Sequence, residues 1–220
     1  MFFHRFKKTI PNYEEFVKDL DTGDILLYQT SFWYSRLIEY FTKSPYSHIS
    51  IVLKKPTWLA DDLTDDFYLL ESGGEVFPDA VSGQMRFGVQ VAPLREVYEQ
   101  YAHQNYGHLY VRKLSGTSSQ DDIKLKIKEA YGLLKDKPYD IHPLDWIKSY
   151  FDLNKPLDEI KGEERTDCYW CSALVSFVYC CCGFLDKNIP WTIIAPSDFC
   201  YQNHRLEFHD CTLGNDFRLI

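Results

Sequence analysis

The sequence predicts an α+β domain in which an antiparallel β-sheet packs against helices. Short apolar segments typical of strands occupy residues 25–28, 46–53 and 67–74, and several more follow them. The two strongest helical patterns, at residues 121–134 and 168–183, come later in the chain. Strands that are grouped before the main helices, instead of alternating with them, favour an antiparallel sheet.

Composition limits the class of protein. With 220 residues, of which 45% are hydrophobic, the chain can bury a sizeable core, and we expect one domain over residues 1–220. The net charge of −8 argues against a nucleic-acid partner, which needs a basic surface patch. Seven cysteines, three of them adjacent, do not suggest a disulfide framework, and no apolar stretch follows the basic residues at 1–8. We therefore expect no signal peptide and a cytoplasmic protein.

Local patterns predict the other elements in order. Phe16, Val17 and Leu20 have helical spacing, and Pro45 is expected to end a second helix. The first quarter is predicted to contain a helix at 13–20, a turn at 21–24, a strand at 25–28 and a helix at 35–42. Later segments are predicted as strands at 76–81, 88–94, 108–112 and 206–208, helices at 94–101 and 146–151, a polar linker at 115–120, a turn at 137–140 and a charged loop at 155–166.

Two strands carry polar side chains at positions of interest. Period-two alternation divides the first strand into two faces: Ile49, Ile51 and Leu53 on one, and His48, Ser50 and Val52 on the other. In the next strand, Glu71 shares a face with Leu69, which suggests an inward carboxylate that needs a partner. The alternative interpretations are a structural histidine and a solvated carboxylate at a strand end.

The segment from Cys168 to Leu185 contains no charged residue and is predicted to form a buried helix that stops at Gly183. Cys171 lies in its first turn, where unpaired backbone N–H groups and the helix dipole favour a thiolate. The run is close to the lower limit of about 17 residues for a membrane span, but its serines and tyrosines argue against a transmembrane segment. The cysteines are alternatively small core hydrophobes. A zinc site would use Cys168, Cys171, His204 and His209.

A thiol nucleophile needs a base within hydrogen-bond reach, and the base needs a third group that orients it. Here the candidates are Cys171 at a helix start, with His48 and Glu71 on adjacent strands. A helix start facing neighbouring strands is the papain-type arrangement, in which spatial geometry matters more than the order along the chain.

Six segments resemble the permuted NlpC-type papain-like proteins, in particular their YiiX/YebB-like branch. They are residues 22–27, 46–52, 70–71, 137–140, 170–175 and 196–199, in the family's order. The resemblance covers about residues 20 to 200. It implies a circularly permuted papain-like domain whose antiparallel half-barrel packs against helices. It also implies that Cys171 is the nucleophile, His48 the base and Glu71 the orienting residue, with no cofactor and no metal. Ala173 departs from the family, which usually has glutamate there, so a family-specific contact is expected to be missing; Cys168 is a rival nucleophile outside the motif.

The resemblance predicts a hydrolase of amide bonds that works through a thioester. Tyr28, Tyr169 and Ser172 are further candidates for the oxyanion or substrate pocket, beside the backbone N–H of Cys171. The expected substrate is a peptide, an amide or a lipid acyl group. A lipid acyl hydrolase or acyltransferase is the enzymatic alternative, with residues 32–34 and Trp191 either lining an acyl groove or forming ordinary core. A non-catalytic module, with or without zinc, is the other alternative, and the sequence does not indicate an oligomeric state.

Overall fold

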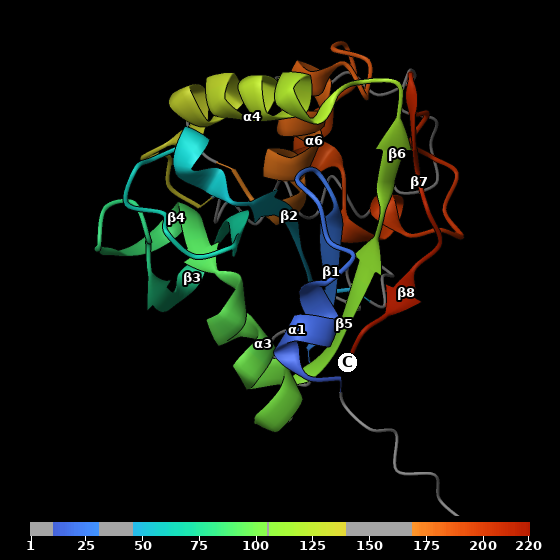
Figure 1. Ribbon diagram of the computed structural model, residues 1–220. Helices are drawn as coiled ribbons and strands as arrows, with labels where there is room; N and C mark the ends of the chain where they lie inside the picture. The colour runs from blue at the N-terminus through green and yellow to red at the C-terminus, as the bar shows by residue number, and fades with distance from the viewer. Residues whose placement is uncertain (1–10, 31–45, 105, 140–168) are drawn as a thin grey trace, which may run out of the picture.

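The computed structural model describes residues 11–30, 46–104, 106–139 and 169–220 (Figure 1). Its elements, with η for 3-10 helices, are α1 (Tyr13–Val17), β1 (Ile25–Thr30), β2 (His48–Lys54), η1 (Pro56–Trp58), β3 (Phe67–Pro78), β4 (Met85–Pro93), α3 (Leu94–His103), β5 (Gly107–Arg112), β6 (Leu114–Gly116), α4 (Gln120–Leu134), α6 (Cys171–Cys182), η3 (Trp191–Ile193), η4 (Pro196–Phe199), β7 (Cys211–Leu213) and β8 (Phe217–Arg218). Several predictions lie outside the described residues: the helices at 35–42 and 146–151, the loop at 155–166, the aromatic residues 32–34, the segment 1–8 and Cys168.

The described strands form an antiparallel six-stranded sheet in the order β4-β3-β2-β1-β5-β8, while β6 pairs separately with β7. The predicted α+β class with an antiparallel sheet is therefore confirmed. The register sets Tyr28 opposite His48, and Glu71 opposite Gln90. Neighbouring strands thus bring the polar residues of the candidate site close together.

Helices cover both faces of the sheet (Figure 1). One hydrophobic cluster lies between the sheet and the helices α4 and α6, and a second cluster lies between the sheet and the helices α1 and α3. In β2, Ile49, Ile51 and Leu53 belong to the first cluster, whereas Val52 belongs to the second. The two faces predicted for this strand are confirmed, and both are buried.

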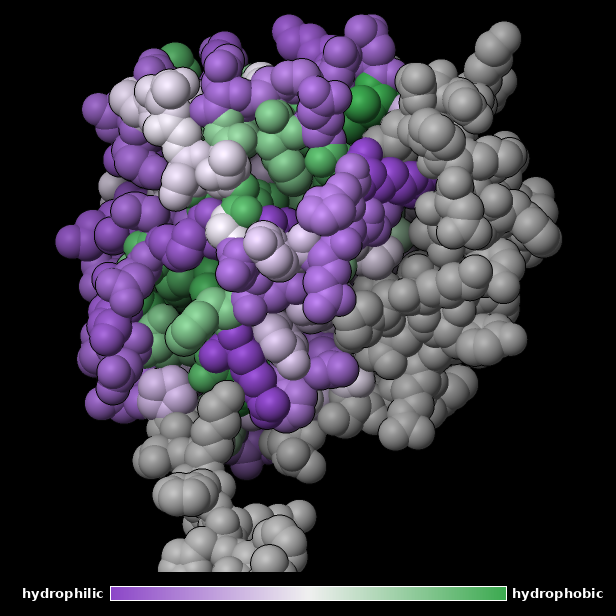
Figure 2. Space-filling view, turned by 90° about the vertical axis from the view of Figure 1, so that its right-hand side faces the viewer, coloured by the Kyte–Doolittle hydropathy of each residue, from purple (hydrophilic) through white to green (hydrophobic). Residues whose placement is uncertain are grey.

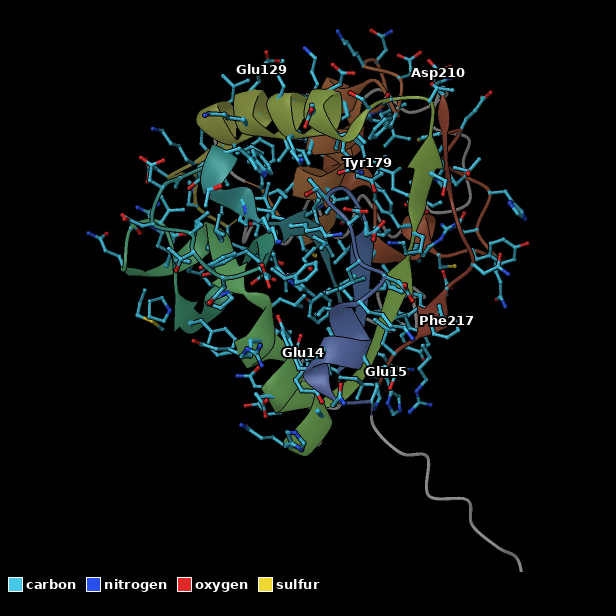
Figure 3. The ribbon with its side chains drawn as sticks, viewed as in Figure 1. Glu14, Glu15, Glu129, Tyr179, Asp210 and Phe217 are labelled. Carbon is cyan, nitrogen blue, oxygen red and sulfur yellow. The ribbon has the colours of Figure 1, made fainter. Side chains whose placement is uncertain are left out.

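The helix α6 runs through the first cluster and is apolar on nearly all sides, as a central helix must be. Full burial of a leucine such as Leu174 contributes about 1.5–3 kcal/mol. The helix ends as predicted at Gly183, whose φ of 79° suits glycine and whose N–H bonds to the carbonyls of Cys180 and Tyr179. Tyr179, a residue of α6 that is labelled in Figure 3, is buried, and its hydroxyl donates to the carbonyl oxygen of Gly23 at 2.7 Å.

The glycine pair Gly73-Gly74 does not end its strand, contrary to the prediction. Both residues stay paired with β4, opposite Gly88 and Phe87, and β3 continues to Pro78. The predicted strand at 76–81 is therefore not a separate element. Glycine permits extended as well as turn conformations, and here the pairing with β4 keeps both residues extended.

The C-terminal tail also differs from the prediction. Residues 206–208 form no strand, and the last strands are β7 and β8 instead. Part of the predicted linker at 115–120 belongs to β6, which pairs with β7. Pairing between segments that are nearly a hundred residues apart supplies backbone hydrogen bonds that local sequence patterns do not reveal.

The buried side chain of Arg112 connects the C-terminal tail to the sheet through hydrogen bonds. The guanidinium of Arg112, at the end of β5, donates to the carbonyl oxygens of Gly214 at 2.6 Å, Phe199 at 2.7 Å and Leu213 at 2.6 Å. The carboxylate of Asp216 lies 3.5 Å from its Nε. Arg112 is only 5% exposed, so nearly all of its hydrogen-bonding capacity is used inside the protein.

Figure 2 views the side of the molecule that carries β7 and β8, where the coloured atoms are mostly hydrophilic with small hydrophobic areas between them. This agrees with the net charge of −8. Among the described residues, no helix has both the length and the apolar character that crossing a bilayer requires. The cytoplasmic location stays a prediction.

Candidate active site

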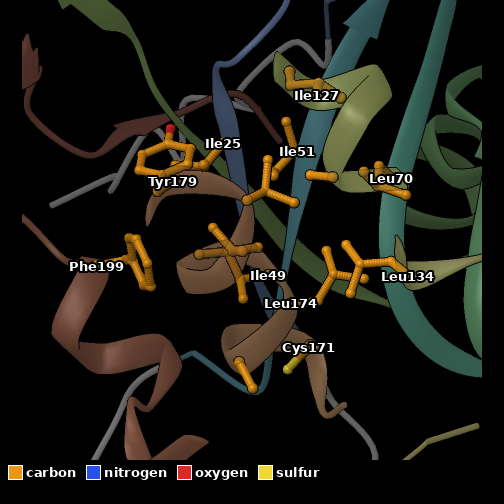
Figure 4. Close-up of a cluster of buried hydrophobic side chains, with 14 of the residues drawn as sticks. Ile25, Ile49, Ile51, Leu70, Ile127, Leu134, Cys171, Leu174, Tyr179 and Phe199 are labelled. Carbon is orange, nitrogen blue, oxygen red and sulfur yellow. The ribbon is translucent and has the colours of Figure 1, made fainter. Parts of the chain in front are cut away.

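Cys171 is the first residue of α6, as the sequence predicts. The preceding Trp170 occupies the N-cap position, where it offers no side-chain oxygen to the free N–H groups of the first turn. These groups and the positive end of the helix dipole therefore act at the cysteine sulfur. Cys171 is 5% exposed, and Figure 4 shows it at the end of the core cluster beside Leu174.

The chain that leads into α6 is held by the sheet. The Ser72 hydroxyl, on β3, donates to the carbonyl oxygen of Tyr169 at 2.6 Å, and the Tyr169 N–H donates to the carbonyl oxygen of Pro138 at 3.1 Å. Because these bonds fix the backbone two residues before Cys171, they also fix the position of the helix start.

His48 and Glu71 form a hydrogen-bonded pair on adjacent strands. His48 Nε2 lies 2.8 Å from Glu71 Oε2, and the two side chains are 21% and 10% exposed. Burial alone would raise the pKa of Glu71, but the charge of His48 and hydrogen bonds from His48 and Gln90 hold it below the usual value. Glu71 is thus an inward carboxylate with a partner, as the strand pattern suggests.

The third member of the group is Cys171, whose sulfur interacts with the imidazole of His48 and raises its pKa. Since Nε2 of the ring faces Glu71, Nδ1 is the nitrogen left for the sulfur. Burial lowers the pKa of His48, but the charges of Glu71 and Cys171 and their hydrogen bonds outweigh it and raise the value to about 10. The structure therefore brings all three predicted residues together around one imidazole.

Two neighbours of this group were not singled out from the sequence. Gln90 Nε2 donates to Glu71 Oε1 at 2.8 Å, and a Cβ atom added to Gly73 would lie 3.6 Å from His48 Cε1. The sequence places Gln90 only in a strand at 88–94. One feature of the sequence could have pointed to Gln90. Its amide lies between two valines, and an amide side chain is uncommon in a strand buried on both faces.

Comparisons with known proteins bear on the fold. No family model matches the sequence, and no curated protein matches it either. The crystal structure of the metalloprotein YiiX from Escherichia coli O157:H7 is similar, with a TM-score of 0.51 and 18% sequence identity. The match covers 89% of this chain and 97% of that one. The chain has a YiiX-like fold. At this identity the likeness shows the fold alone, and it agrees with the branch that the sequence resembles.

Within the YiiX-like fold, the three further pocket candidates occupy different places. The Tyr28 ring packs edge-on against His48, with centroids 4.8 Å apart, and its hydroxyl lies 2.8 Å from the Ser50 hydroxyl. The Tyr169 ring stacks on Trp191 at 5.3 Å, inside the core. The Ser172 hydroxyl donates to the carbonyl oxygen of Ile194 at 2.5 Å. Among the described contacts of these three residues, Tyr28 packs its ring against a triad residue, and a role for it as an oxyanion donor stays a prediction.

The described residues do not fit a metal site. No group of three or more histidine, cysteine or acidic side chains among them is arranged to hold an ion. His204 and His209 are exposed, whereas Cys171 is buried against His48. Cys168 lies outside the described residues. Ala173, where the family has glutamate, is 3% exposed in the core cluster, so a carboxylate at this position would have to be buried.

The His48–Glu71 pair predicts a pH window of stabilisation. The pKa of His48 rises from 6.5 to about 10, so its contribution is complete below pH 6.5 and is lost as the pH rises through about 10. The pKa of Glu71 falls from 4.5, so its contribution is present above pH 4.5 and is lost on further acidification. We expect Glu71→Gln to lower the Tm most between about pH 5 and 9. Thermal unfolding of both proteins across the pH range checks this, and a Tm difference that is the same at every pH would contradict it.

Proposed function

We propose that this protein is a circularly permuted papain-like cysteine hydrolase of amide bonds. Cys171 is its nucleophile, His48 its base and Glu71 the residue that orients the base. The observation that carries this proposal is the position of His48, whose Nε2 is 2.8 Å from Glu71 and whose pKa is raised by both Glu71 and Cys171.

In the first half of the reaction, the Cys171 sulfur attacks the carbonyl carbon of the substrate while His48 holds the thiol proton. Backbone N–H groups in the first turn of α6, including that of Cys171, stabilise the oxyanion, and one such donor contributes about 10²–10³-fold. The C–N bond then breaks, His48 gives its proton to the leaving amine, and a thioester remains on Cys171.

In the second half, His48 removes a proton from a water molecule, which attacks the thioester carbon. The C–S bond breaks, the acid leaves, and the proton returns to the sulfur and imidazole pair. General acid–base catalysis of this kind accelerates the reaction by about 10²–10⁴-fold. Glu71 keeps Nε2 engaged throughout, so that Nδ1 faces the reacting atoms.

The lipid acyl alternative differs only in the substrate and the acceptor. An ester replaces the amide, and a lipid hydroxyl takes the place of water if the enzyme is a transferase. Trp191 does not support an acyl groove, because it is 3% exposed and packs between Tyr169 and Phe177. Residues 32–34, the other candidates for such a groove, lie outside the described residues.

The pH dependence of iodoacetamide alkylation tests the proposal. A free thiol with a pKa near 8.5 is under about 1% thiolate at pH 6, whereas a thiolate paired with an imidazolium stays reactive. We expect Cys171 to react at pH 6 and His48→Ala to slow this reaction about 100-fold. Peptide mass spectrometry separates Cys171 from Cys182 and Cys211, internal controls whose pKa values burial raises to about 12 and about 11.

His103→Ala is the matched control, because this histidine is exposed on α3 and contacts Glu99 rather than Cys171. Its alkylation profile should equal that of the unaltered protein. The catalytic proposal fails if Cys171 reacts only above about pH 8, as a free thiol does, or if His48→Ala leaves its rate unchanged. A stoichiometric metal in the purified protein, with Cys171 unreactive, would favour a metal-binding module, as the description of YiiX as a metalloprotein suggests.

A further inference from the structure

The carboxylate of Glu71 is held on both sides. Its Oε2 bonds to His48 and its Oε1 accepts a hydrogen bond from Gln90 Nε2, each at 2.8 Å. Gln90 lies directly opposite Glu71 in the β3–β4 pairing, and the two residues are 2% and 7% exposed. A carboxylate that is bound through both oxygens cannot rotate about its C–C bond without losing a contact.

We propose that Gln90 is a positioning residue, which fixes the Glu71 carboxylate so that its second oxygen holds the His48 ring toward Cys171. This inference rests on the proposed function. It extends the triad by one residue that never touches the substrate and acts only through Glu71.

The orientation of the Gln90 amide follows from its partner. The ionised carboxylate only accepts hydrogen bonds, so the NH₂ end of the amide must face it. The opposite orientation would set the amide carbonyl against a negative charge. Glu71 and Gln90 therefore define each other's geometry, whereas an aliphatic residue at 90 would leave Glu71 Oε1 without this donor.

The carbonyl end of the Gln90 side chain indicates that stability alone does not explain why a glutamine occupies this position. Gln90 Oε1 is buried and has no hydrogen-bond partner in the described part of the chain. An unpaired buried carbonyl oxygen is destabilising, and a residue with only a packing role would satisfy both ends or have no polar atoms. The Gln90 side chain therefore keeps its hydrogen bond to Glu71 although its carbonyl oxygen is destabilising.

Gly73 keeps the space between these side chains free. A Cβ atom there would lie 3.4 Å from Glu71 Oε1, 3.6 Å from His48 Cε1 and 3.7 Å from Gln90 Nε2. The side chains of His48, Glu71 and Gln90 thus all approach the backbone of Gly73. These are ordinary van der Waals distances, and it is the 2.8 Å hydrogen bond between Glu71 and His48 through which a shift of the carboxylate is expected to move the imidazole.

The test compares Cys171 alkylation at pH 6 and pH 9 in Gln90→Met, which keeps the length of the side chain but removes the donor. We expect the rate at pH 6 to fall about tenfold while the rate at pH 9 stays unchanged, because loss of one anchor weakens the imidazolium that sustains the thiolate. The titratable groups around His48 are Glu71, Cys171 and Tyr28, whose ring packs against the imidazole. Burial raises the pKa of Tyr28 well above its usual value, so this phenol stays neutral over the range used.

Val91→Ala is the matched control, since Val91 is the next residue of β4 and is fully buried in the first hydrophobic cluster, where it makes no polar contact with Glu71. We expect it to lower the Tm without changing the ratio of the two rates. If Gln90→Met also lowers the Tm but keeps the ratio, Gln90 is only structural and the inference is wrong, while the triad stands. If Cys171 of the unaltered protein is not alkylated at pH 6, the proposed function fails, and the inference fails with it.

A second measurement needs no variant. The side-chain amide protons of Gln90 are observable by NMR in the unaltered protein, and their shifts should follow the protonation of Glu71 on acidification. They should also exchange slowly with solvent because of burial. Amide signals that exchange rapidly and do not respond to acidification would overturn the proposal, even if Gln90→Met does not fold.

Discussion

Cys171→Ser is expected to reduce hydrolysis by on the order of 10⁴-fold or more. The serine hydroxyl fills nearly the same volume at the start of α6, so the fold and the His48–Glu71 pair should persist. A hydroxyl, unlike a thiol, is not ionised near neutral pH by an imidazole alone. The reaction therefore loses its nucleophile while substrate binding is kept, and kcat should fall much more than KM changes.

The assay uses a panel that separates the substrate classes: an aryl ester, a peptide anilide and a phospholipid. Cys181→Ser is the matched control, because Cys181 is partly exposed and lies on the same helix about 15 Å along its axis from Cys171. It should retain full activity. Activity retained by Cys171→Ser on every substrate that the protein cleaves would contradict the assigned nucleophile. Cleavage of the phospholipid alone would select the lipid acyl alternative.

Arg112→Met is expected to lower the free energy of unfolding by about 3–5 kcal/mol. Methionine has a similar length but no donors, so the buried carbonyl oxygens of Phe199 and Leu213, the partly buried one of Gly214 and the Asp216 carboxylate lose the guanidinium. Removal of one partner of a buried charged group costs much more than the net stabilisation of the pair, because the groups left behind are already desolvated.

Urea unfolding followed by circular dichroism gives this free energy, provided that the transition remains two-state. Arg95→Met is the control, since the Arg95–Glu14 pair is exposed and should contribute less than about 1 kcal/mol. Equal losses from the two substitutions would show that Arg112 does not fasten the tail.

The parts of the fold that the sequence predicts are those with local causes. The alternation of β2, the start of α4 after the polar linker and the end of α6 at Gly183 each follow from neighbouring residues, and the structure has all three, with Ser119 as the N-cap of α4. Glu71 was recognised for the same reason, because a carboxylate between apolar residues of a strand requires a partner.

The parts that were missed depend on contacts between distant segments. The role of Gln90 depends on the register that sets it opposite Glu71, and the tail depends on Arg112, about a hundred residues earlier in the chain. Neither relation has a periodicity or a spacing that a single sequence reveals. The glycine pair at 73–74 was misjudged because glycine suits both a turn and a close approach between backbones.

The order of the site along the chain has a consequence for synthesis. His48 and Glu71 lie in the first third of the polypeptide, and Cys171 follows Glu71 by one hundred residues. At ordinary rates of translation, the ribosome adds that stretch in roughly 5 to 20 s. Until α6 has been made and has docked on the sheet, the cysteine has neither its imidazole nor the aligned N–H groups of a packed helix. Under the proposed function, the nascent chain therefore carries only ordinary thiols until the segment that contains Cys171 has been made and has folded.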